Sequence, residues 1–173
     1  MIEFNKRTGF IYVRTQPGQT KNVFEQFKKF DWVIGAWAIA GEYDAILFVN
    51  ANNYDELYGW ANTVKKWDGV MYTNSHFTYN GAITTPTTLQ NHGVWTHIRC
   101  TDIENVMKNI RRYDYVTAWV NTPGDYDLCV WVNGKTVDEA LNNVWNMTQQ
   151  EHWDTKTYVP MTRYFNTRYA TTI

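Results

Sequence analysis

The stretch Gly41-Glu42-Tyr43-Asp44 returns 83 residues later in the chain as Gly124-Asp125-Tyr126-Asp127. The positions around both stretches match at the same offset without a gap. The identical pairs are Asn22/Asn105, Val23/Val106, Asp31/Asp114, Val33/Val116, Val49/Val132, Asn50/Asn133, Asp55/Asp138 and Glu56/Glu139. A long match of a chain with itself at one offset indicates two copies of one structural unit. The fold of the whole chain therefore follows from the fold of one copy.

Outward from the repeated stretch, the hydrophobic period switches between strand and helix patterns in the same order in both copies. The first copy predicts strands at 10–13, 33–39, 45–49 and 70–79 with helices at 20–30 and 54–65, and the second predicts strands at 94–100, 116–120, 128–132 and 157–165 with helices at 102–112 and 137–149. The order β-α-β-β-α-β is that of a ferredoxin-like unit, an antiparallel sheet with both helices on one face.

The face of each sheet away from its helices carries large apolar side chains. In the first copy, strand alternation puts Tyr12 and Phe48 on this face and Ile11 on the helix side. The corresponding residues of the second copy are Trp95 and Trp131. Such surfaces would drive association if they stayed in water. We therefore predict an α+β fold in which the two ferredoxin-like repeats pack sheet to sheet, as an intrachain dimeric α/β barrel.

The domain boundaries follow from composition. Residues 81–91 are polar and unpatterned and contain Gly and Pro, so they predict a linker between a first repeat at 1–80 and a second at 92–173. A unit of about 80 residues is close to the lower limit for a self-sufficient hydrophobic core. The two repeats should therefore depend on each other for stability.

Bulk properties argue against several classes of partner. The net charge is −1 and the pI about 6.4, so no global positive field attracts a phosphate backbone. No apolar run approaches the roughly 18 residues of a membrane span, and the N-terminus has no apolar signal region. The two cysteines, Cys100 and Cys129, form no CxxC pattern. We expect a cytoplasmic protein that does not bind membranes, a structural metal or a cofactor.

The first copy also carries the pattern of a known family. Its residues are the strand Phe10-Ile11-Tyr12-Val13, the strand pair 33–49 with the turn Gly41-x-Tyr43-Asp44, and Asp55-Glu56-Leu57. This tract resembles the effector-binding (RAM) domain of the Lrp/AsnC regulators. The resemblance implies a dimeric α/β barrel that binds amino acids or related small molecules at subunit interfaces near the turn.

The chain departs from that family in two respects. The helix-turn-helix that usually precedes the effector domain is missing, so we expect no direct DNA binding. Two effector domains are fused, which suggests that one chain does the work of a dimer. The second repeat carries the resemblance more weakly than the first.

The repeated turns supply the candidate ligand-binding residues. Gly41 and Gly124 allow a positive φ angle and close approach of the backbone, and Asp44 or Asp127 can accept a hydrogen bond from an ammonium group. In the alternative interpretation, the glycine serves only the hairpin, the tyrosine packs on the sheet edge and the aspartate caps the turn. The full candidate set is Gly41, Glu42, Tyr43, Asp44, Gly124, Asp125, Tyr126 and Asp127.

These features predict a non-enzymatic regulatory module that binds an amino acid or a similar metabolite and acts through a homo-oligomer or a partner protein. We predict no catalytic residues. Two alternatives stay open. One is an α/β-barrel enzyme of the haem or small-monooxygenase type, for which the chain offers the histidines His76, His92, His97 and His152. The other is a single-stranded RNA-binding module, because RNA-recognition domains place base-stacking rings on the same first and third strands.

Overall fold

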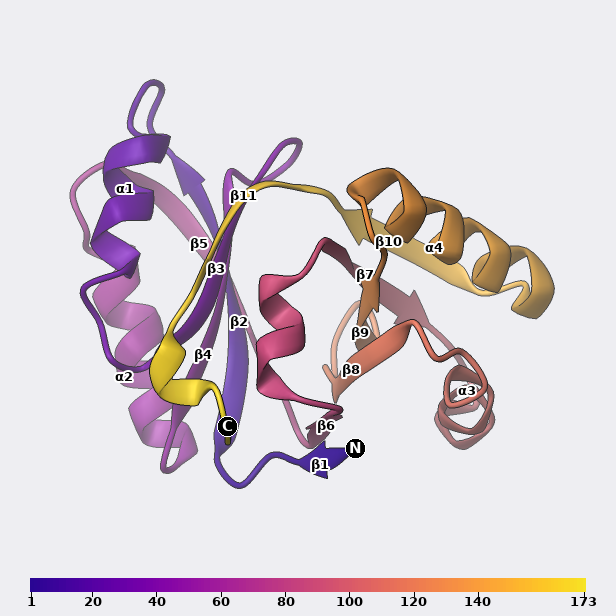
Figure 1. Cartoon of the computed structure of the whole chain (residues 1–173). Coiled ribbons are helices and arrows are strands. Elements are labelled where there is room, and N and C mark those ends of the chain that lie inside the picture. The colour runs from indigo at the N-terminus through magenta and orange to yellow at the C-terminus, as the bar shows by residue number, and fades with distance from the viewer.

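The computed structural model describes residues 1–173 and contains two antiparallel sheets with helices on their outer faces (Figure 1). The elements are β1 (Ile2–Glu3), β2 (Arg7–Thr15), α1 (Thr20–Phe27), β3 (Val33–Ile39), β4 (Ala45–Ala51), α2 (Tyr54–Lys65), β5 (Val70–Phe77), β6 (Gly81–Ile83), η1 (Pro86–Gln90), β7 (Gly93–Arg99), α3 (Ile103–Ile110), β8 (Val116–Asn121), β9 (Leu128–Asn133), α4 (Val137–Glu151), β10 (Asp154–Tyr158), β11 (Pro160–Phe165) and η2 (Thr167–Tyr169). The two predicted β-α-β-β-α-β units are confirmed as β2–β5 and β7–β10. None of the helices combines the length and the hydropathy that crossing a membrane requires.

Local signals begin the second helix of each unit in the same way. The side chain of Asn53 accepts a hydrogen bond from the Glu56 amide, and Glu56 reaches back to the amide of Asn52. In the second unit Thr136 and Glu139 make the corresponding contacts. Both pairs supply acceptors to backbone N–H groups that the first helical turn leaves free.

The strand that follows each unit joins the sheet of the other unit. The first sheet has the order β11-β3-β4-β2-β5, and the second has the order β1-β6-β8-β9-β7-β10. Strand β6 follows the first unit but pairs with β8 of the second, while β11 follows the second unit but pairs with β3 of the first. The two halves therefore hold each other through exchanged strands.

This exchange changes two sequence-based expectations. The single strand predicted over 157–165 is wrong, because the chain makes two strands there, β10 and β11, that belong to different sheets. Segment 81–91, expected as a linker, forms β6 and η1, and its residues Pro86, Thr88 and Leu89 are buried. A segment that crosses from one sheet to the other must cover apolar surface, which explains the burial.

Three hydrophobic layers result. The middle layer lies between the sheets and contains Tyr12 at 2% exposure, Trp95 at 1%, and Phe48 and Trp131 at 0%. Outer layers lie between each sheet and its helices, with Ile11 and Val13 in the first. The predicted sheet-to-sheet packing is confirmed. The same burial removes the support for RNA binding, because rings inside the molecule cannot stack on bases.

The structure corrects the alignment of the two repeats at their first strands. Phe10 lies opposite Phe48, and Trp95 lies opposite Trp131, so Phe10 and Trp95 are equivalent. By the same ladders the counterpart of Tyr12 is His97, not Trp95. The cause is the connection before the first helix: residues 16–19 carry a Pro-Gly turn in the first repeat, whereas the second repeat is two residues shorter there.

Candidate functional site

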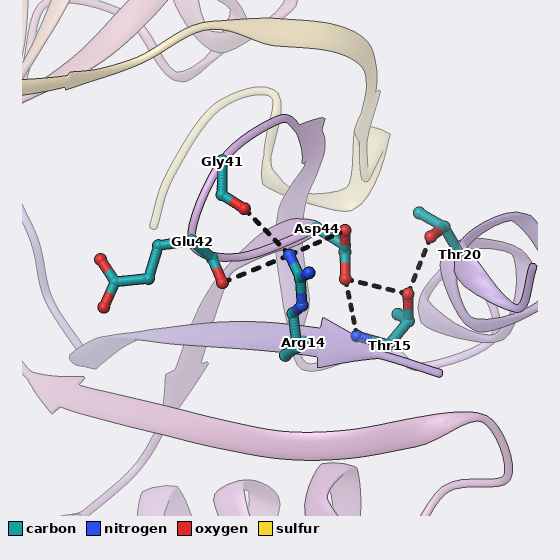
Figure 2. A network of polar contacts seen from close by, with 6 residues as sticks. All are labelled: Arg14, Thr15, Thr20, Gly41, Glu42 and Asp44. Carbon is teal, nitrogen blue, oxygen red and sulfur yellow. Dashed lines mark hydrogen bonds and ion pairs between the residues drawn. The ribbon is translucent and has the colours of Figure 1, made fainter. Parts of the chain in front are cut away.

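The first repeated turn is tied to the end of strand β2 by a polar network (Figure 2). Gly41 has a φ of 121°, a conformation that favours glycine. The Arg14 guanidinium donates to the Gly41 carbonyl at 2.9 Å and lies 3.5 Å from Asp44 Oδ1. Asp44 Oδ2 accepts hydrogen bonds from the Thr15 amide at 2.8 Å and from the Thr15 hydroxyl at 3.1 Å.

The second turn repeats the arrangement. Gly124 has a φ of 153°, and Arg99 donates through Nε to the Asp125 carbonyl at 2.8 Å. Asp127 Oδ2 accepts from the Cys100 amide at 2.8 Å. In both turns the last aspartate thus accepts a hydrogen bond from one backbone N–H at the end of the first strand of its repeat. The carboxylates of Asp44 and Asp127 are engaged in holding the turns.

The middle residues of the two turns meet at one small pocket between the sheets. The pocket has a volume of about 70 Å³. Four of the eight candidate residues line it: Glu42, Tyr43, Asp125 and Tyr126. The other six lining residues lie outside that set of eight, although His76 and His97 were considered for the haem alternative: Tyr12, Asn74, His76, His97, Lys156 and Tyr158. Gly41, Asp44, Gly124 and Asp127 shape the turns but do not line the pocket.

The 10 lining residues form pairs related by the repeat. Glu42 corresponds to Asp125, and Tyr43 corresponds to Tyr126. The strand ladders supply the other pairs: Tyr12 lies opposite Asn74 as His97 lies opposite Lys156, and Phe10 lies opposite His76 as Trp95 lies opposite Tyr158. Both repeats therefore contribute equivalent positions to one pocket at their junction. Alternation along the last strand of each repeat, taken with the corrected register, is the signal that would have found the missed residues.

Tyr12 and His97 join the repeats at the inner wall. The Tyr12 hydroxyl is hydrogen-bonded to His97 Nε2, and His97 Nδ1 lies 3.6 Å from Cys129 Sγ. Burial, with smaller effects from His76 and Lys156, lowers the pKa of His97 from 6.5 to about 3. Burial also raises the pKa of Tyr12 well above its usual value. Both groups are therefore neutral at pH 7, and we assign the Tyr12 hydroxyl as donor to the imidazole.

The outer rim is polar and differs between the repeats. Lys156 Nζ lies 2.6 Å from Glu42 Oε2 and 5.3 Å from the centroid of the Tyr158 ring. The hydrogen bond that Lys156 donates to Glu42 raises the pKa of Lys156. On the opposite side Asn74 donates to the Tyr43 hydroxyl at 3.1 Å. Burial lowers the pKa of His76, which the charge of Asp125 partly offsets. The histidines of the pocket are thus neutral, and Lys156 is its one cation.

The remaining histidines lie elsewhere. His92 Nδ1 is 3.0 Å from Arg163 Nη2, and His152 ends helix α4 with a φ of 56°. No group of three or more His, Cys, Asp or Glu side chains is arranged to hold a metal ion. The chemistry that the pocket offers is hydrogen bonding and ion pairing inside an aromatic wall.

Comparison with known proteins relates the chain to one sequence family and to several solved structures. Residues 8–87 match the model of the Lrp/AsnC ligand binding domain. The siroheme decarboxylase NirDL has a TM-score of 0.66 at 8% identity, over 94% of this chain and 76% of that chain. A mutant chlorite dismutase from Candidatus Nitrospira defluvii has a TM-score of 0.55 at 12% identity, over 89% of this chain and 91% of that chain.

The protein FFRP-DM1 has a TM-score of 0.41 at 24% identity, over 42% of this chain and 99% of that chain. No curated protein matches this chain in sequence. At these identities the solved structures show a shared fold, the ferredoxin-like α/β barrel, and not a shared activity. The match over residues 8–87 relates the first repeat of this chain, by similarity, to the Lrp/AsnC ligand binding domain.

Proposed function

We propose that the chain is a non-enzymatic regulatory module that binds an amino acid or a similar small metabolite in the pocket between the two repeated turns. The observation that carries this proposal is the convergence of Glu42 and Tyr43 with Asp125 and Tyr126 on one pocket. The ligand-binding domain family of residues 8–87 supports it. Small-molecule sites commonly lie where two structural units meet and place a few polar groups in an aromatic wall.

The position of the pocket suggests how binding is reported. A ligand that contacts both turns favours the arrangement of the repeats in which the pocket is closed, and so shifts the population toward it. We propose that this shift changes assembly of the chain into a homo-oligomer or its contact with a regulatory partner. Through such a partner, the chain would regulate transcription without contacting DNA itself.

The first test is a thermal-shift and tryptophan-fluorescence screen of the purified chain against the 20 amino acids and common metabolites. A ligand that binds only the folded state must raise the melting temperature, by an amount that grows with its concentration. A hit should be lost in His76→Ala, which changes the pocket, and kept in His92→Ala, which changes a histidine outside it. A panel without any hit would contradict the proposal.

A second candidate, an enzyme, rests on the Tyr12–His97 pair. An imidazole hydrogen-bonded to a phenol at a pocket wall brings together two groups that acid–base enzymes use. Burial opposes that role here, because it moves the pKa of His97 and the pKa of Tyr12 away from neutrality. Haem does not fit: the pocket of about 70 Å³ has no room for a tetrapyrrole, and His97 Nε2 is taken by Tyr12. The absorption spectrum of the purified chain should therefore lack a Soret band, and a Soret band would contradict this conclusion and favour a haem enzyme over the binding module.

A further inference from the structure

We propose that the pocket binds its ligand through a primary ammonium group, held by Asp125 beside His76 and Asn74. This inference rests on the proposed function and names the chemistry of its ligand. The position is the repeat equivalent of the one that Lys156 Nζ occupies against Glu42. The chain thus fills one half of the pocket with its own ammonium group and leaves the other half for a ligand.

The filled half shows what the site accepts. Glu42 from the first repeat and Lys156 from the second form an ion pair at 2.6 Å across the junction. The Lys156 ammonium also lies over the Tyr158 ring, 5.3 Å from its centroid, where the negative face of the ring attracts a cation. In this half of the pocket, a carboxylate and an aromatic ring together bind an ammonium group.

The other half has the same layout without the cation. Asp125 takes the place of Glu42, His76 the place of Tyr158, and Asn74 the place of Lys156. The Asn74 side chain is short and neutral, and its amide donates to the Tyr43 hydroxyl. Asp125 forms no ion pair, while its charge acts on His76 enough to oppose the effect of burial on the pKa of that imidazole.

The charges around this half select against an anion. Two carboxylates and one ammonium group line the pocket, and Lys156 is already paired with Glu42. The guanidinium of Arg99 lies close, over the Tyr126 ring, but it pairs with Asp154 at 3.2 Å and does not line the pocket. A ligand carboxylate placed here would meet Asp125 uncompensated, whereas an ammonium group would neutralise it.

The space also limits the ligand. Gly124 stands beside His76, whose Nδ1 lies 3.6 Å from the place that a Cβ atom at this glycine would take. The absence of a side chain leaves that approach open, and the neutral imidazole offers a lone pair to an N–H donor. A pocket of about 70 Å³ holds only a few heavy atoms. The ligand is therefore a small primary amine or the amino end of a compact amino acid.

The test is isothermal titration calorimetry of the full chain at pH 7.5 with three probes of one size: n-propylamine, 1-propanol and propionate. We expect one n-propylamine per chain and no measurable binding of the alcohol or the anion. Asp125→Asn should weaken n-propylamine binding by about tenfold or more, because a charged hydrogen-bond partner is lost. Asp138→Asn, in the first turn of α4 and outside the pocket, removes the same charge and should leave binding unchanged.

Two further variants add or remove a lysine ammonium group in the pocket. Asn74→Lys places an ammonium group in the second half and should abolish n-propylamine binding. Lys156→Asn empties the first half and should raise the stoichiometry to two per chain. Melting curves of each variant establish that it is folded, and Asp125→Asn, at an exposed position, carries the test alone if Asn74→Lys does not fold.

Failure of this inference is distinct from failure of the proposed function. Binding of propionate in place of the amine, or amine binding that survives both Asp125→Asn and Asn74→Lys, would overturn the ammonium site while a metabolite hit in the thermal screen upheld the binding module. Absence of both a hit in that screen and n-propylamine binding would overturn both proposals.

Discussion

At the scale of single residues, the buried His97 imidazole should make stability depend on acid. Its pKa of about 3 in the folded chain lies far below the usual 6.5. Between these values the unfolded chain binds a proton that the folded chain does not, so protonation favours unfolding. The stability that comes from keeping His97 neutral is fully present above pH 6.5. As the pH falls toward 3, the free energy of unfolding decreases by up to about 1.4 kcal/mol per pH unit.

Urea unfolding at pH values from 7.5 down to 4.5 tests this linkage. The free energy of unfolding of the native chain should fall more steeply with acid than that of His97→Gln, which keeps a hydrogen-bonding side chain beside Tyr12 but does not titrate. His152→Gln, an exposed position, should keep the native slope. Parallel slopes for the native chain and His97→Gln would show that this imidazole is not held neutral.

Two glycines allow the effect of a positive φ angle to be measured without any effect of crowding. Neither Gly41 nor Gly59 has a neighbouring atom within 4 Å of an added Cβ, but Gly41 has a φ of 121° and Gly59 lies inside helix α2. Gly41→Ala should therefore lower the free energy of unfolding by about 1 kcal/mol or more, and Gly59→Ala should raise it by up to about 1 kcal/mol. Chemical denaturation of both variants measures the two effects, and a shift of the same sign in both would contradict the argument.

At the scale of elements, the exchanged strand β11 is anchored by Asn166. The Asn166 side-chain amide donates to the Val33 carbonyl at 3.1 Å, and the Asn166 backbone N–H donates to the Ile34 carbonyl at 2.9 Å. Asn166→Ala leaves the buried Val33 carbonyl without this donor. We expect a loss of about 1–3 kcal/mol in the free energy of unfolding.

Limited proteolysis should then cut the variant first in the segment from β11 to the C-terminus. Thr171→Ala, an exposed position in the same segment, is the matched control and should behave as the native chain. Equal stability of Asn166→Ala and the native chain would mean that the ladder between β11 and β3 alone holds the exchanged strand.

The sequence could predict which faces of the strands are buried, but not the register of every strand or the sheet that it joins. The faces of the strands followed from alternation, so the burial of Tyr12 and Trp131 was predictable. The register of β7 was not, because two residues missing from a turn leave no identity that reveals the gap. The crossing of β11 was also hidden, since the choice of sheet depends on which edge lies nearest in space. The pair Glu42–Lys156 joins positions 114 apart, which no local pattern connects.

At the scale of the whole molecule, the two repeats should unfold as one unit. The middle core and both exchanged strands contact both halves, so neither half keeps its surfaces covered when the other is lost. Urea unfolding followed by tryptophan fluorescence and by far-UV circular dichroism should give coincident transitions. Two separated transitions would show that the repeats are independent domains.

Fusion of the repeats has a consequence that reaches beyond stability. In an assembly of two identical chains, every residue at the junction occurs twice, so a lysine at the rim would occupy both half-sites or neither. Covalent linkage keeps the halves together at any dilution and lets each copy diverge alone. Lys156 and Asn74 record such symmetry breaking, with one half of the pocket closed by the chain itself and the other left open to its surroundings.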